Sequence, residues 1–125
     1  MIYTSYFGNW RKHPEGYRKV CIARWAPRQV PIDLMAIELA PSESLLKSAK
    51  AHLIDNAQYT IEFNKWLVQL DPVEVGKRYD GCILLCYEKA NDFCHRHLVR
   101  EWLTKAGIDC KEVNSNESLC IKSED

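Results

Sequence analysis

The pattern of apolar and polar residues along the chain predicts strands that alternate with helices. The run 82–86 is apolar at every position, which is typical of a strand buried on both faces of a parallel sheet. Residues 26–41 contain three prolines, and we expect an irregular loop there with one short extended piece, because proline removes a ladder donor. Residues 119–122 are a further candidate for an edge strand. The runs with strand character are 2–7, 17–23, 82–86 and 109–113.

Apolar residues at helical spacing predict three helices between the second and third strands. Each segment is preceded by a residue that favours a helix N-terminus: Ser42, Asp55 and Asp71. Asp55 is followed by a glutamine three residues later, as in a capping box. Asp71 is followed by Pro72, which is favoured at the first helical position.

A fourth helix is predicted over residues 92–106, with Asn91 or Asp92 as its N-cap and Gly107 at its end. The alternation of strands and helices predicts an α/β fold. We expect a single small domain over residues 1–125. It would have three layers and a mainly parallel sheet of about four strands covered by helices.

Composition narrows the classes of protein. The chain is 46% hydrophobic and 27% charged, which suffices for one core and argues against disorder. It has 17 basic and 17 acidic residues, so no overall field attracts nucleic acid or a membrane, although basic residues gather in the first quarter. We expect no secretory leader and no membrane span, because no apolar run approaches ~20 residues. We therefore expect a cytoplasmic protein.

The six cysteines predict free thiols rather than a disulfide framework. Cys21, Cys82, Cys86 and Cys110 lie in or beside strand-like apolar runs, where a reduced cysteine packs as a small apolar residue. This placement also favours a reducing compartment.

Reactive side chains gather where the third strand ends and the last helix begins. Glu88 follows the strand, and Cys94, His95 and Arg96 come at the start of the helix. Open α/β proteins bind their ligands at such a position. At ~100° per residue, His95 falls on the apolar face of the helix and should point at the sheet. The helix terminus and Arg96 both favour a thiolate at Cys94.

Parallel strands would bring further polar groups to the same edge. Ser5 near the end of the first strand and Arg24 at the end of the second would converge with Arg96 and the helix N-terminus, an arrangement suited to a phosphate or carboxylate. Cys86, at the end of the third strand, is either a core residue or a site residue. Trp10 and Trp25 are candidates to cover the site or to form a dimer contact.

We expect no metal site and no cofactor. Structural zinc sites use tight pairs such as C-x-x-C, whereas seven residues lie between Cys86 and Cys94. His95 and His97 should point in different directions on a helix, and one helical turn does not easily aim Cys94 and both histidines at one ion.

The stretch LLCYEKANDFCHRHLVREWL resembles the signature of a bacterial and phage family called domain of unknown function 488. That signature is a strand ending in Cys-x-Glu, a short loop, and Cys-His-Arg opening a helix, here Cys86 and Glu88, then Cys94, His95 and Arg96. The segments IYTSYFGNWRK, CIAR and LAPSESLLKSAK are also similar to the family. The resemblance implies an α/β fold and a site at these residues, and it implies no particular reaction.

These features leave three interpretations open. The first is an enzyme acting on a phosphorylated or nucleotide-like substrate. The second is a non-catalytic module that binds phosphate, a nucleotide or nucleic acid, and the third is a structural Cys/His cluster without activity. The sequence selects neither the substrate nor the oligomeric state. The catalytic candidates are Cys94, His95 and Glu88. The ligand-binding candidates are Ser5, Arg24, Cys86 and Arg96.

Overall fold

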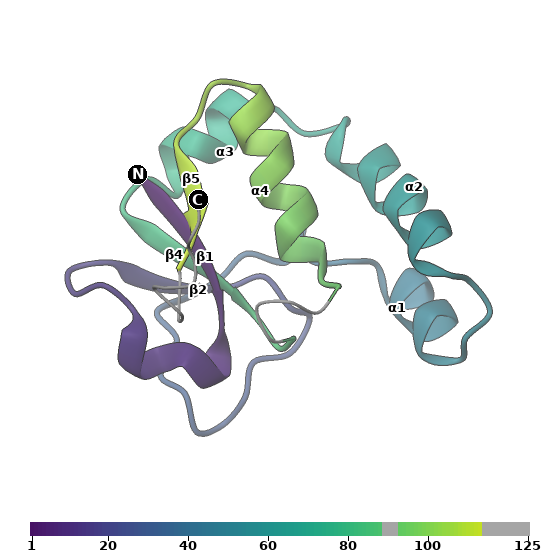
Figure 1. Cartoon of the computed structure of the whole chain (residues 1–125), viewed down its shortest axis with the longest axis horizontal. Coiled ribbons are helices and arrows are strands. Elements are labelled where there is room, and N and C mark those ends of the chain that lie inside the picture. The colour runs from purple at the N-terminus through teal and green to yellow at the C-terminus, as the bar shows by residue number, and fades with distance from the viewer. Residues whose placement is uncertain (89–92, 114–125) are drawn as a thin grey trace, which may run out of the picture.

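The computed structural model describes residues 1–88 and 93–113, and a five-stranded sheet forms its centre (Figure 1). The strand order is β3-β2-β4-β1-β5, and every neighbouring pair is parallel. The α/β prediction is therefore confirmed, with one strand more than expected. Residues 119–122 lie outside the described residues. The strands are β1 (Ile2–Tyr6), β2 (Arg18–Cys21), β3 (Leu34–Met35), β4 (Cys82–Cys86) and β5 (Cys110–Glu112).

Strand β4 is the centre of the sheet, as its uninterrupted apolar sequence predicts. All five of its residues are buried, because β1 and β2 pair with its two edges and both of its faces are covered. Tyr6 pairs with Cys86, and Cys21 pairs with Leu85. The carboxyl ends of β1, β2 and β4 consequently lie at one edge of the sheet.

The first three α-helices begin where their capping residues predict. Side-chain oxygens of Ser42, Asp55 and Asp71 each accept a hydrogen bond from a backbone N–H in the following turn, at 3.0, 2.8 and 2.9 Å. These bonds satisfy donors that a helix N-terminus otherwise leaves unpaired. The helices are α1 (Glu43–Lys50), α2 (Asn56–Leu67), α3 (Pro72–Arg78) and α4 (His95–Lys105), with short 3-10 helices η1 (Phe7–Lys12) and η2 (Ile37–Leu39).

Helix α4 begins later than its sequence predicts. Its N-cap is Cys94, which has extended backbone (φ −155°, ψ 143°) and makes no side-chain cap. Asn91 and Asp92, the expected caps, lie outside the described residues. The polar run before the helix has the composition of a cap, but the helix starts only at His95. Its end is as expected, with Gly107 following at φ 84°, a conformation that favours glycine.

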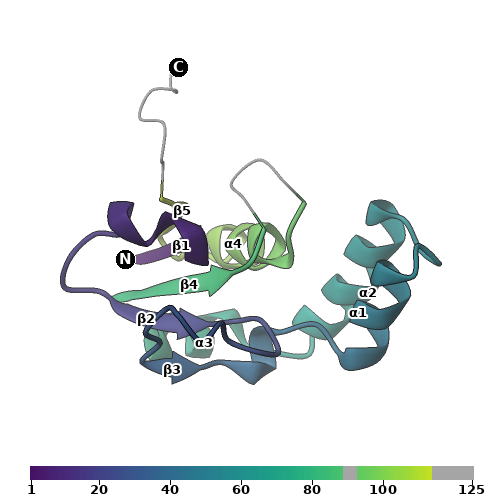
Figure 2. The ribbon, with the colours of Figure 1, turned by 90° about the horizontal axis from the view of Figure 1, so that it is seen from below.

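The sheet is covered on both faces, which gives three layers. Helices α2, α3 and α4 pack with Leu84 and Ile22 into the larger core, whereas Phe7 of η1 and the loop after β2 cover Ile83 and Leu85. The hairpin of α1 and α2 lies beyond the end of the sheet toward which the arrows of β2 and β4 point (Figure 2). This placement makes the hairpin a wall in front of the carboxyl edge.

Candidate active site

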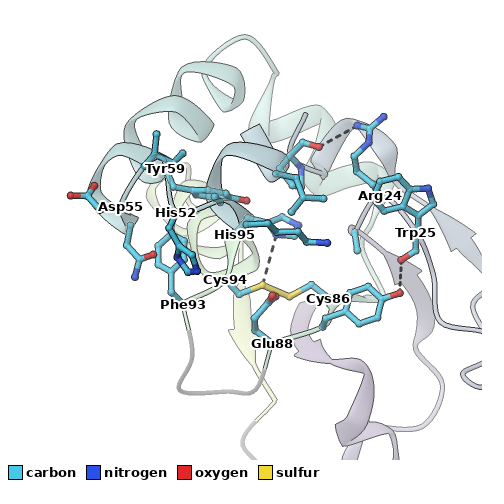
Figure 3. Close-up of a pocket in the computed structure, with 18 residues that line it drawn as sticks. Arg24, Trp25, His52, Asp55, Tyr59, Cys86, Glu88, Phe93, Cys94 and His95 are labelled. Carbon is cyan, nitrogen blue, oxygen red and sulfur yellow. Dashed lines mark hydrogen bonds between the residues drawn. A yellow bond between two sulfur atoms is a disulfide. The ribbon is translucent and has the colours of Figure 1, made fainter. Parts of the chain in front are cut away.

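A cavity of about 760 Å³ lies at the carboxyl edge of the sheet. It is bounded by the residues after β2, the end of β4, the start of α4, and the α1–α2 hairpin (Figure 3). Its volume falls within the usual range for small-molecule sites. Five of the seven predicted site residues line it: Arg24, Cys86, Glu88, Cys94 and His95.

Ser5 does not join the other predicted site residues. It pairs with Leu85 in the sheet, so both side chains lie on the face opposite the α-helices. Its buried hydroxyl accepts a hydrogen bond from Asn9 Nδ2 (3.3 Å) and lies 3.1 Å from His13 Nε2. The prediction that Ser5 converges with the other residues was based only on the edge of the sheet that the strand ends share. Successive residues of a strand point to opposite faces of the sheet, so residues at one edge can still lie on different faces.

Arg96 is fully buried and lies behind the cavity rather than in it. Its Nε and Nη2 donate to the carboxylate of Glu112 at 2.9–3.2 Å. Its Nη1 donates to the Cys86 sulfur at 2.9 Å and to the Glu88 carbonyl at 2.8 Å. The guanidinium thus connects α4 to the ends of β4 and β5, and it positions the cavity wall. An anion-binding role for Arg96 stays a prediction that these contacts do not support.

A disulfide joins Cys86 to Cys94, which corrects the expectation of free thiols at these two positions. Cys86 ends β4 on the helix-bearing face, and Cys94 precedes α4 in an extended conformation that returns its side chain toward the strand. Cys21, Cys82 and Cys110 are free and buried, as predicted. Burial raises the pKa of all three thiols, that of Cys110 to about 12, so they remain protonated.

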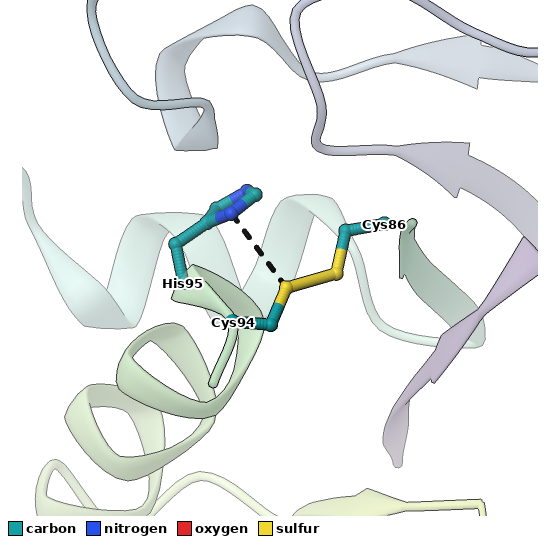
Figure 4. A group of neighbouring side chains, drawn as sticks. All are labelled: Cys86, Cys94 and His95. Atoms are coloured by element: carbon teal, nitrogen blue, oxygen red, sulfur yellow. Dashed lines mark hydrogen bonds between the residues drawn. A yellow bond between two sulfur atoms is a disulfide. The ribbon is translucent and has the colours of Figure 1, made fainter. Parts of the chain in front are cut away.

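The ring of His95 lies against the disulfide, on the side of Cys94 (Figure 4). Its Nε2 is 2.6 Å from the Ile22 carbonyl oxygen. Because a carbonyl only accepts hydrogen bonds, Nε2 must carry the proton. Nδ1 therefore has a lone pair, and it lies 3.8 Å from Cys94 Sγ. Burial, more than the positive charge of Arg96, lowers the pKa of His95 to about 4, so the imidazole is neutral at neutral pH.

The cavity rim carries both signs of charge. Arg24 is half-buried, and its Nη1 donates to the Pro41 carbonyl at 3.2 Å. Lys50 and His52 also line the cavity, and they come from the end of α1 and the residues after it. His52 has φ 57°, an uncommon backbone conformation for a residue other than glycine. Glu88 is exposed, and its charge adds to burial in raising the pKa of Tyr59.

Several lining residues have no signal in the sequence. Lys50, His52, Asp55 and Tyr59 reach the cavity only because the α1–α2 hairpin packs in front of the sheet edge. The sequence pattern places these residues in or beside α1 and α2, but only the packing of the hairpin against the rest of the fold brings them to the cavity. Of the two tryptophans expected to cover the site, Trp25 lines the cavity, and Trp10 is not among the lining residues. Phe93 also contributes, and its ring meets that of Tyr59 edge to face at 5.2 Å.

The signature that frames this cavity also carries the comparison with known proteins. The family described as "Active DUF488-N3 subclade" matches residues 2–107. The chain belongs to this family, DUF488-N3a. The matched range of this DUF488-N3a protein contains every residue that lines the cavity. No curated protein and no solved structure matches the chain. Within the described residues, no helix combines the length and the apolarity needed to cross a membrane.

Proposed function

We propose that this DUF488-N3a protein is an enzyme that acts on an anionic, nucleotide-like small molecule bound in the cavity. The observation that carries the proposal is the neutral imidazole of His95, held by Ile22 with its Nδ1 lone pair next to Cys94. A buried titratable group with a strongly shifted pKa in a cavity is a common mark of a functional site. The family description, "Active", agrees with this proposal.

The lining favours a ligand with an anionic end and a planar end. Arg24 and Lys50 supply positive charge, and the N-terminus of α4 opens on the same space. Helix N-termini and guanidinium groups are both suited to phosphate. The rings of Tyr59, Phe93 and Trp25 line the cavity, and such rings offer faces or edges to a base. A nucleotide combines these two features in one molecule.

We assign proton transfer to Glu88 on geometry, because its carboxylate is exposed and lines the cavity, where it can reach a bound ligand. His95, with a pKa of about 4, is a weak base at neutral pH. We assign its Nδ1 the role of accepting a hydrogen bond from, or coordinating, a group at the Cys94 end of the cavity. The reacting bond of the ligand then lies between Glu88 and the Cys94–His95 edge.

Binding is tested by calorimetric titration of the reduced protein with adenosine 5′-monophosphate, ribose 5-phosphate and inorganic phosphate. We expect the nucleotide to bind more tightly than the other two, because only it uses the aromatic side. Arg24→Gln should weaken nucleotide binding by about tenfold or more, since a hydrogen bond to a charged group contributes about 1.5–3 kcal/mol. Arg11→Gln, an exposed arginine of η1, is the matched control and should bind as the wild type does.

Catalysis is tested by incubating the reduced protein with nucleotides and following products by mass spectrometry. We expect conversion by the wild type and loss of it in Glu88→Gln, with binding retained. If nucleotides bind but none is converted, the enzyme proposal is wrong and the protein is a non-catalytic binding module. Nucleotide binding that Arg24→Gln leaves unchanged would refute the proposed site. No binding of the nucleotide, or binding no tighter than that of inorganic phosphate, would refute the proposed substrate class.

A further inference from the structure

We propose that Cys86, Cys94 and His95 bind one divalent transition-metal ion of the zinc class when their disulfide is reduced. Each of the three offers one ligand atom, and these atoms lie within 4.8 Å of one another. All three side chains are buried, yet all three line the cavity. Two thiolates and one imidazole are a donor set typical of zinc, and catalytic zinc sites keep a fourth position open.

The distance between the two cysteines fits an ion between their sulfurs. The Cα atoms are 7.6 Å apart, whereas disulfides usually hold them ~4.4–6.8 Å apart. Two sulfurs that bind the same tetrahedral zinc ion at ~2.3 Å lie ~3.8 Å from each other, whereas the two sulfurs of a disulfide lie ~2.05 Å apart. The additional ~1.7 Å brings the observed Cα separation into agreement with the ordinary reach of two cysteine side chains.

The imidazole is already prepared to bind a metal. A histidine ligand commonly donates its other N–H to a backbone carbonyl, and this bond fixes the tautomer and the orientation of the ring. His95 donates Nε2–H to Ile22 O at 2.6 Å, and its Nδ1 lies 3.8 Å from Cys94 Sγ. The lone pair thus faces the space that the two sulfurs border, and no proton has to leave the ring.

The surrounding charges also favour a divalent cation. Arg96 Nη1 donates to the Cys86 sulfur at 2.9 Å, a contact that stabilises a thiolate. The carboxylate of Glu112 accompanies this guanidinium at 2.9 Å. Of these described charges, Arg96 and Glu112 offset each other, so two thiolates would leave two negative charges in a buried place. A divalent ion neutralises them.

The structure removes the reason for expecting no metal here. That expectation placed Cys94 in the first turn of the helix, and it held that one helical turn does not easily aim Cys94, His95 and His97 at one ion. Cys94 instead precedes α4 in an extended conformation, so its sulfur and the His95 ring approach each other (Figure 4). His97, whose Nδ1 lies 3.3 Å from Arg100 Nη2, is not required as a ligand.

The binding step balances without a further reagent once the disulfide is reduced. A thiol reductant supplies two electrons and two protons to the disulfide, and it leaves as its own disulfide. The two new thiols release their protons to solvent as the metal binds. The open coordination position then faces the cavity, where it takes an oxygen of water or of the bound anion. The inference deepens the proposed function, since it makes Cys94 a ligand and leaves proton transfer to Glu88.

The test is a titration of the reduced, metal-free protein with Co²⁺, an ion whose spectrum reports its ligands. We expect saturation at one ion per chain, with intense visible bands of tetrahedral cobalt and a sulfur-to-cobalt charge-transfer band. Cys86→Ser and Cys94→Ser should each lose about half of the charge-transfer intensity and bind at least tenfold more weakly. Cys82→Ser is the matched control, a free buried cysteine on the same strand and face, and its spectrum should be unchanged.

A second measurement covers variants that fail to fold. In the folded, reduced wild type, Zn²⁺ should protect the thiols of Cys86 and Cys94 from a thiol reagent. The slow reaction of the free, buried Cys21, Cys82 and Cys110 should not change. The inference is overturned if the reduced wild type binds no cobalt, if the cobalt spectrum lacks sulfur bands, or if zinc protects no thiol. Arg24→Gln separates the two proposals, because it should lose nucleotide binding and keep the cobalt spectrum. Nucleotide binding without cobalt binding refutes the metal site alone, and cobalt binding without nucleotide binding refutes the proposed function alone.

Discussion

Acidification should destabilise the oxidised, metal-free protein through His95. The pKa of this imidazole is about 4 in the folded chain and ~6.5 when the chain is unfolded. The unfolded state therefore binds more protons between these values, and stability falls as the pH drops from ~6.5 toward ~4. At neutral pH both states are uncharged at this position, so the full stability is present there. Between about pH 7.5 and about pH 5, the linkage relation gives a loss of about 2 kcal/mol.

The assay is urea unfolding at these two pH values, with chelator and without reductant, for the wild type and for His95→Gln. The glutamine amide keeps a donor for the Ile22 carbonyl and has no titratable group. Other groups also respond to pH, including His13, whose pKa burial lowers, and they contribute to both proteins alike. The wild type should lose about 2 kcal/mol more than His95→Gln does over this range.

Parallel losses in the two proteins would refute the reasoning. They would mean that His95 titrates as an exposed histidine does, and hence that its ring is neither buried nor fixed by Ile22. The absolute stability of His95→Gln at neutral pH does not enter the comparison, so a destabilised variant still gives an answer as long as it folds.

Three further substitutions test how the site is supported. Glu112→Gln leaves the buried Arg96 without a carboxylate and should lower the free energy of unfolding by about 3 kcal/mol; a loss below about 1 kcal/mol in urea titration would show that the pair is not buried. Gly76→Ala places a Cβ 2.6 Å from Ile108 Cδ1 and should destabilise by about 1–2 kcal/mol. The same change should cost clearly less in an Ile108→Ala background, which removes all three carbons that approach the added Cβ, and equal losses in both backgrounds would exclude this contact as the cause. Asp55→Ala removes the cap of α2 and should cost about 1 kcal/mol in thermal unfolding followed by circular dichroism; an unchanged melting temperature would contradict the capping role.

The elements with strong local signals are those that the sequence predicts well. The apolar run of β4 and the capping residues Ser42, Asp55 and Asp71 act through neighbouring residues, so pattern and structure agree there. Strand β3 has only two residues, both exposed, and pairing with β2 creates it. Its position within a proline-rich loop was predictable, and its register was not.

The candidate site was predictable in part for the same reason. Cys86, Glu88, Cys94 and His95 are close in the sequence around one strand–helix junction, so local reasoning brings them together. Local reasoning fails for Ser5, since the direction of a side chain depends on its position in the alternation of the strand. It also fails for the burial of Arg96, which depends on a carboxylate from β5.

The most direct test of the proposed site is a nuclear magnetic resonance titration of the reduced protein with adenosine 5′-monophosphate. The account predicts saturable shifts of backbone amides around the cavity, at Arg24, Asn56, Glu88 and His95, that Arg24→Gln weakens. Shifts confined to the basic residues of η1, or no saturable shifts at all, would contradict it.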